Sequence, residues 1–270
     1  MTVRNPVVAG AFYPASKNSL TREVEALIDS KAAREDAIGV VCPHAGYIYS
    51  GAVAGSVLSS IKPRKSYIII GPNHTGLGSQ IGLDTSSSWK TPLGDVLIDK
   101  PLAEAIKKHS HLVRDDSLSH AHEHSVEVQL PFLQVLQKDF TFVPLVISYA
   151  GLEEYRDVGR ALAKAVKELK AEKEVTIIAS SDMTHYESQE SAKRKDFIAI
   201  DAILKLDEKR LLEVVAEYDI SMCGYAPAAI MIVAAKELGA TKANLVRYQT
   251  SGDASGDYSA VVGYAGIIVK

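Results

Sequence analysis

The chain has 270 residues, 47% of them hydrophobic and 23% charged, so it is long enough to bury a full core. Its formal net charge of -3 gives no whole-chain attraction to nucleic acid or to an anionic membrane, and we expect neither as a partner. The sequence has no signal-peptide pattern and no apolar run near the roughly 18 residues of a membrane span. With two cysteines, too few for a disulfide framework, these features predict a cytoplasmic protein.

Short β-branched apolar runs alternate with amphipathic segments of helical period, which is typical of an α/β domain. In the first half of the chain we expect a helix at Leu20–Ala33, a strand at Ile38–Cys42, a helix at Gly51–Ser60, a strand at Tyr67–Ile70, a strand meander bordering the sheet from Ile81 to Asp99, and helices at Leu102–His109 and Val126–Leu136. In the second half we expect a strand at Phe140–Ile147, a helix at Leu152–Lys170, a strand at Val175–Ala179, helices at Ala192–Leu206, Lys209–Tyr218 and Tyr225–Leu238, and strands at Ala243–Gln249 and Ser259–Val269. Pro131 predicts a kink or a late start in its helix. No repeat or long linker divides the chain, so we expect one domain over residues 1–270.

Three of the predicted strands run directly into segments that carry a histidine. His44 follows the first strand, His74 follows the second, and Asp182 and His185 follow the strand that ends at Ala179. Asp182 lies three residues before His185, so we expect it to orient or charge-stabilise the His185 ring in a turn. Open α/β sheets build their sites at the carboxyl ends of their strands, so we expect these side chains to lie near one another. Any one histidine alone would be a hydrogen-bonded surface or core residue.

The segment from Ser119 to Ser125 is rich in histidine but lacks the HExxH spacing of a zinc protease. In an extended segment His120, His122 and His124 would point to one side, with Glu123 on the other. Ser125 is a candidate cap for the helix that follows. A solvated loop is an equal alternative for His120 and His122, while His124, nearest the helix start, is the better site candidate.

The two cysteines differ in their surroundings. Cys223 lies between two predicted helices, next to Gly224 and just before Pro227, where a helix N-terminus would stabilise its thiolate for metal binding or nucleophilic attack. Cys42 ends an apolar strand, and we expect it to be a buried structural thiol.

Six sequence blocks, spread from residue 9 to residue 227, carry a specific resemblance to the Memo family, which is called AmmeMemoRadiSam system protein B in microbial genomes. The blocks are AGAFYP, CPHAGYIYSG, GPNHTG, HEHSVEVQLPFL, SSDMTHY and CGYAP. The resemblance implies a fold like that of the class III extradiol dioxygenases: a three-layer sandwich with a central mixed β-sheet flanked by helices.

The resemblance also implies a metal site made by His44, His74 and Cys223, with Asp182 and His185 lining the same pocket. His124 is similar in position to the acid/base histidine of the dioxygenases. Those enzymes use a carboxylate as the third iron ligand, and a cysteine makes the site softer. We expect iron(II), with copper or zinc as alternatives.

Two functions of different class follow from these residues. The first is a metal-dependent oxidoreductase or redox protein, in which His185 and His124 move protons while the metal binds oxygen or a small aromatic or enediol-like molecule. The second is a non-enzymatic adaptor that binds a peptide or protein and keeps a vestigial metal pocket. The family name also implies partners in a radical-SAM pathway. The substrate and the oligomeric state stay open.

Overall fold

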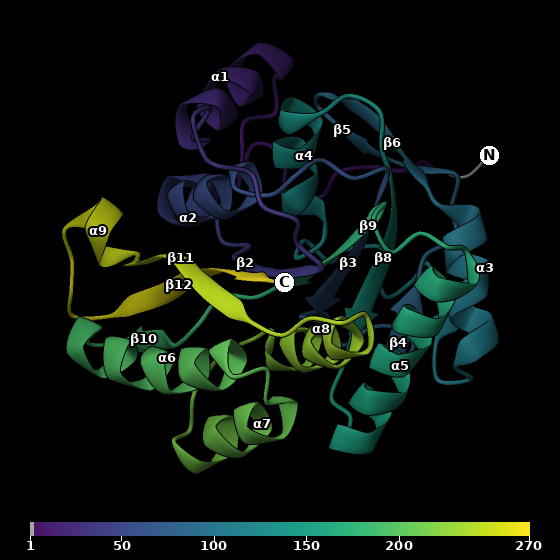
Figure 1. Ribbon diagram of the computed structural model, residues 1–270. Coiled ribbons are helices and arrows are strands. Elements are labelled where there is room, and N and C mark those ends of the chain that lie inside the picture. The colour runs from purple at the N-terminus through teal and green to yellow at the C-terminus, as the bar shows by residue number, and fades with distance from the viewer. Residues whose placement is uncertain (1–2) are drawn as a thin grey trace.

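A mixed β-sheet of 12 strands runs through the computed structural model, which describes residues 3–270 (Figure 1). The strands are β1 (Val3–Arg4), β2 (Gly39–Cys42), β3 (Ser66–Pro72), β4 (Ile81–Leu83), β5 (Ser88–Thr91), β6 (Gly94–Ile98), β7 (Arg114–Asp115), β8 (Thr141–Ile147), β9 (Val175–Ser180), β10 (His185–Glu187), β11 (Ala243–Thr250) and β12 (Val261–Val269). Their main order is β1-β5-β6-β8-β3-β9-β2-β12-β10; β11 pairs with β12, and β4 pairs with β8 and β7.

The centre of the sheet is parallel, and its flanks combine parallel and antiparallel pairs. Strands β8, β3, β9 and β2 lie side by side in parallel, whereas β12 runs antiparallel to β2 and β4 runs antiparallel to β8. The carboxyl ends of β3, β9 and β2 therefore meet at one edge of the sheet. Any side chains delivered just after these strands gather at that edge.

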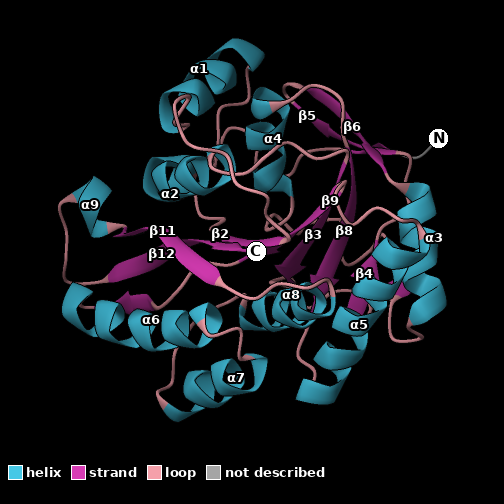
Figure 2. Cartoon of the chain, viewed as in Figure 1, coloured by secondary structure: helices cyan, strands magenta, loops and turns pink. Residues whose placement is uncertain are grey.

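Helices cover both faces of the sheet (Figures 1 and 2). They are α1 (Lys17–Leu27), α2 (Tyr47–Ser59), α3 (Lys100–His109), the single 3-10 turn Glu127–Gln129, α4 (Leu130–Leu136), α5 (Leu152–Glu168), α6 (Gln189–Leu204), α7 (Glu208–Glu217), α8 (Tyr225–Glu237) and α9 (Gly252–Ser255). Alternate residues of β3 point to opposite faces: Ile68 and Ile70 pack with α5 and α8, and Tyr67 and Ile69 pack in the core that holds α1, α2 and α4. The predicted α/β class, with a mixed sheet flanked by helices, is confirmed, and the arrangement is consistent with the predicted three-layer sandwich.

Most of the predicted elements are present, with shifted ends. The strand predictions lie within two residues of the observed bounds, and the predicted meander is β4 plus the β5–β6 hairpin, which border β8. Pro131 does mark a late start, since α4 begins at Leu130 after the 3-10 turn. None of the described helices combines the length and the apolar character that crossing a membrane requires.

The predicted bounds of two helices were wrong by four residues or more. Helix α1 ends at Leu27 rather than Ala33, because the chain turns there and the backbone of Leu27 packs closely against Gly55 of α2. Helix α2 begins at Tyr47, four residues before the predicted Gly51. The backbone NH of Tyr47 donates to the carbonyl of Phe12 at 2.8 Å, so the N-terminal segment holds the start of α2 beside His44.

Candidate metal centre

Three of the predicted ligands come together at the carboxyl edge of the sheet. His44 follows β2, His74 follows β3, and Cys223 lies in the turn before α8. One ligand atom from each residue lies within 4.8 Å of the other two, and Cys223 Sγ is 3.3 Å from His44 Nε2. Gly224 allows this arrangement, because a Cβ there would collide with the carbonyl of Ser180 at the end of β9.

The surroundings of His44 fix which ring nitrogen is free. Ser180 Oγ donates to the carbonyl of Ser125 at 2.6 Å and accepts from Gln129 Nε2 at 2.9 Å. With its one proton used, the Ser180 hydroxyl can only accept from His44 Nδ1, which is 3.0 Å away. Burial, followed by the neighbouring His74 and His124, lowers the pKa of His44 well below its usual value. His44 is therefore neutral, with the lone pair of Nε2 facing Cys223.

A buried carboxylate fixes which ring nitrogen of His74 is protonated. Glu123, 1% exposed, lies 3.0 Å from His74 Nδ1 and accepts from the backbone NH groups of His74, His124 and Ser125 at 2.6 to 2.8 Å. Burial opposes ionisation of Glu123, but these hydrogen bonds and the His74 charge outweigh it and lower its pKa to about 2. Burial opposes protonation of His74, but the hydrogen bond and charge of Glu123 outweigh it and raise the pKa of His74. An ionised carboxylate accepts only, so Nδ1 keeps its proton, and it is Nε2 that becomes free when the ring is neutral, as in carboxylate–histidine–metal groups.

A second group of possible ligands overlaps the first. His74, Glu123 and His124 also have ligand atoms within 4.8 Å of one another. Because the Glu123 carboxylate already accepts from four donors, an ion there would have to displace the hydrogen bond to His74 Nδ1. The group of His44, His74 and Cys223 offers free lone pairs without that cost. It fits a transition metal, since two neutral imidazoles and a thiol form a softer donor set than oxygen ligands.

The Cys223 thiol is protonated in the metal-free protein, which corrects the expectation of a thiolate stabilised by a helix N-terminus. Burial, followed by the charge of Asp182, raises the pKa of Cys223. The backbone NH of Asp182 donates to Cys223 Sγ at 3.3 Å and, with the Ser181 hydroxyl, lowers the pKa, but these contacts do not offset burial. A bound cation would supply the missing charge stabilisation. Cys42 is fully buried in β2, as predicted, and burial raises its pKa well above the usual value.

Asp182 and His185 lie beside this group but do not pair in the predicted way. Asp182 Oδ1 accepts from the backbone NH of His44 at 2.8 Å and of Ala45 at 3.3 Å, and so positions the His44 loop. His185 Nδ1 instead donates to the carbonyl of Ser221 at 2.9 Å. The expectation that Asp182 orients the His185 ring was therefore wrong: the backbone beside Cys223 does so.

His124 lies directly against the candidate ligands. Its ring stacks on that of His74 at a centroid distance of 4.8 Å and meets His44 edge-on at 5.6 Å. Phe12 of the N-terminal segment packs against its other side at 4.7 Å. Burial lowers the pKa of His124. The ring is neutral near pH 7 and able to accept a proton in the pocket.

The other two histidines of the segment differ from each other in burial. His120 is fully buried rather than solvated, with Nε2 donating to the carbonyl of Gly82 at 3.1 Å and its ring against Trp89. His122 is exposed, as the loop alternative predicted. Ser125 is no helix cap: its hydroxyl donates to the carbonyl of Pro72 at 3.0 Å, at the end of β3.

A buried arginine anchors this segment from the N-terminal strand. The Arg4 guanidinium donates to the carbonyls of His120 and Glu123 at 2.8 and 2.5 Å and to Glu127 Oε2 at 2.6 Å. It also stacks on Trp89, 4.0 Å from the ring centroid. Arg4 thereby fixes the loop that places Glu123 against His74.

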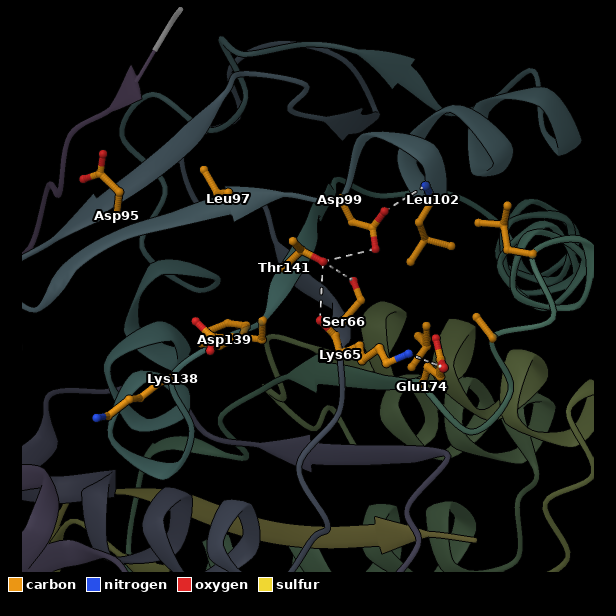
Figure 3. A pocket seen from close by; sticks show the side chains of 14 residues that line it. Lys65, Ser66, Asp95, Leu97, Asp99, Leu102, Lys138, Asp139, Thr141 and Glu174 are labelled. Atoms are coloured by element: carbon orange, nitrogen blue, oxygen red, sulfur yellow. Dashed lines mark hydrogen bonds and ion pairs between the residues drawn. The ribbon is translucent and has the colours of Figure 1, made fainter.

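Two candidate ligands line a small cavity, and a larger cavity lies far from the metal centre. A cavity of about 190 Å³ is lined by His74 and Cys223 together with residues that follow β3 and β8. A cavity of about 700 Å³ opens instead where β3 and β8 begin, at the opposite edge of the sheet (Figure 3). Its Asp99 carboxylate already accepts from Leu102 N and Thr141 Oγ1. Two of the three candidate metal ligands line the smaller cavity, and none lines the larger one.

Sequence reasoning missed the residues that hold the ligands in place. Glu123 was noted but assigned no role, and Ser180 and Gln129 were not considered. Glu123 stands in the same block as His124, so its place in HEHS was a usable signal. No local sequence signal pointed to Ser180 or Gln129, because their roles depend on hydrogen bonds between residues 51 to 136 positions apart in the sequence.

The fold and this ligand group define an α/β protein with a candidate transition-metal centre at the carboxyl edge of its sheet. The family model described as Memo-like protein matches residues 4–268, and the chain belongs to the Memo family. It is 43% identical to a MEMO1 family protein of Methanopyrus kandleri, with 99% of each chain covered. It is 44% identical to a MEMO1 family protein of Methanosarcina acetivorans over the whole of both chains, and 43% identical to one of Pyrobaculum aerophilum over 99% of each.

Proposed function

We propose that this Memo-family chain is a metal-dependent oxidoreductase or redox protein whose single metal ion is held by His44, His74 and Cys223. The observation that carries the proposal is the pair of imidazoles whose Nδ1 atoms are both engaged, by Ser180 and by Glu123. Each ring is thus set in the tautomer that leaves Nε2 for a metal.

Iron(II) is the proposed metal, with copper and zinc as alternatives. The mixed sheet between helices, together with two histidines that follow the strands on either side of β9, supports a class III extradiol dioxygenase-like fold and pocket. The thiol in place of a carboxylate argues for chemistry other than ring cleavage, because a thiolate favours softer ions and changes the redox behaviour of bound iron. A cytoplasmic location is also proposed, since both cysteines are free thiols.

The remaining side chains of the pocket are proposed to handle protons. A bound metal would supply open coordination positions and a redox or Lewis-acid centre for a small molecule. His124, neutral and stacked on His74, would accept a proton from that molecule. His185 donates through Nδ1 to the Ser221 carbonyl, which leaves its Nε2 to accept a proton when the ring is neutral. Asp182 positions the His44 loop through two backbone NH groups.

Metal analysis tests the proposal. The protein is purified anaerobically without an affinity tag, and the metal content of the wild-type chain, Cys223→Ala and Cys42→Ala is measured by elemental analysis. Cys42 is the matched control because it is the other free cysteine and lies fully buried within β2. We expect Cys42→Ala to keep the metal and Cys223→Ala to lose most of it. Equal metal in both variants would contradict the proposed ligand set.

A further inference from the structure

An uncharged groove opens beside the metal pocket, between the start of α5 and helices α7 and α8. Its volume is about 370 Å³. The lining residues are Tyr149, Ala150, Gly151, Leu152, Tyr155, Leu212, Val215, Ala216 and Tyr225. None of these carries a charge, and we call the feature the α5–α7 groove.

The groove adjoins the metal pocket, because the two hollows share lining residues. Tyr149 and Tyr225 line both the groove and the cavity of about 190 Å³ that contains His74 and Cys223. Tyr225 begins α8, two residues after Cys223. Tyr149 follows β8, is 82% exposed and contributes to the lining of both hollows. A molecule that reached the metal could extend past these two rings into the groove.

The groove suits an apolar group. Leu212 and Val215 of α7 are half-buried and pack on the main core. The hydroxyl of Tyr155 accepts from Ala150 N at 2.9 Å, so its polar atom already has a hydrogen-bond partner. The cavity at the opposite edge of the sheet differs, since charged side chains make up much of its lining (Figure 3). Transfer of an apolar group from water to the groove is favourable in proportion to the apolar area that it covers.

We propose that the molecule bound at this site has two parts: a small oxygen-bearing head that chelates the metal, and an aromatic or branched alkyl group that occupies the α5–α7 groove. This inference rests on the proposed function, because it takes the metal of His44, His74 and Cys223 as the anchor for the head. It narrows the substrate class to amphipathic small molecules.

Hydroxamic acids test both parts, because they chelate metals through two oxygen atoms. The zinc-loaded protein is titrated by calorimetry with acetohydroxamic acid and with phenylalkyl hydroxamic acids of increasing spacer length. We expect the best phenylalkyl compound to bind about tenfold more tightly than acetohydroxamic acid, the gain expected from burying most of a phenyl ring. Ala216→Trp, which fills the groove from an exposed position, should abolish that gain and leave acetohydroxamic acid binding unchanged.

Controls separate the possible failures. Leu97→Trp places the same ring at the cavity on the opposite edge of the sheet and should leave both affinities unchanged. Val215→Thr, close in shape but polar, should reduce the gain in part and guards against misfolding of Ala216→Trp. If acetohydroxamic acid does not bind the metal-loaded chain, the proposed metal site fails. If it binds but the phenyl group adds nothing, or if the gain survives in Ala216→Trp, the groove proposal is overturned.

Discussion

Replacing Glu123 with glutamine tests whether one buried carboxylate holds the candidate centre together. Glutamine keeps the size of the side chain and resembles the protonated acid, but it removes the charge and turns one acceptor into a donor. The carboxylate accepts from three backbone NH groups and from His74 Nδ1, so the new amide NH₂ must face a donor. We expect Glu123→Gln to destabilise the fold and to weaken metal binding.

The magnitude follows from the pKa of Glu123. Its value in the fold is about 2 against an ordinary 4.5. At 1.36 kcal/mol per pKa unit, ionised Glu123 stabilises the fold by about 3 kcal/mol at neutral pH. Because the folded pKa is the lower one, this stability is present above pH 4.5 and disappears as the pH falls toward 2. Loss of the carboxylate that accepts from His74 Nδ1 should weaken metal binding by about 10- to 100-fold.

Urea denaturation of the metal-free protein at several pH values measures the first effect. The difference in unfolding free energy between wild type and Glu123→Gln should be largest near pH 7 and shrink below about pH 4.5. Competition for zinc against a chromophoric chelator measures the second effect. The control is Glu127→Gln, whose carboxylate binds Arg4 rather than an imidazole and which should cost stability without a direct loss of metal affinity. A pH-independent difference, or zinc affinity equal to wild type, would refute the role given to Glu123.

Three further outcomes are expected. His185→Ala should keep its metal while His44→Ala loses it, as measured by elemental analysis; equal loss would make His185 a ligand. Arg4→Met should lower the free energy of unfolding by about 3 kcal/mol in urea, because it leaves a buried carboxylate without its cation, whereas Arg22→Met on the exposed face of α1 should be near neutral. Iron-reconstituted protein should show little ring cleavage with a panel of catechols; steady formation of yellow product that is abolished by Cys223→Ala would contradict this.

The sequence predicts the elements well where burial alone decides them. Strands such as β3 and β9 are continuous β-branched apolar runs buried on both faces, and their bounds were close. The short β10, which begins at His185, has no such pattern and exists because it pairs with β12. Local sequence carries no signal for pairing of that kind.

The same distinction applies to the site. The topology rule for parallel strands predicted that His44 and His74 would share one edge, because each follows a buried strand. Cys223 was assigned to them through the family resemblance, since nothing local links the turn before α8 to β2. Its burial, which keeps the thiol protonated, depends on the packing of that turn against Ser181 and Asp182 and was not predictable from spacing.

The contact between His44 and Cys223 spans 179 residues of sequence, and this separation orders the assembly of the site in time. During synthesis the two imidazoles and Glu123 leave the ribosome long before the thiol does. Contacts between distant segments form only after the intervening chain has been made. A nascent chain therefore holds His44 and His74 without Cys223, and the candidate three-ligand group is complete only once the turn before α8 has been made.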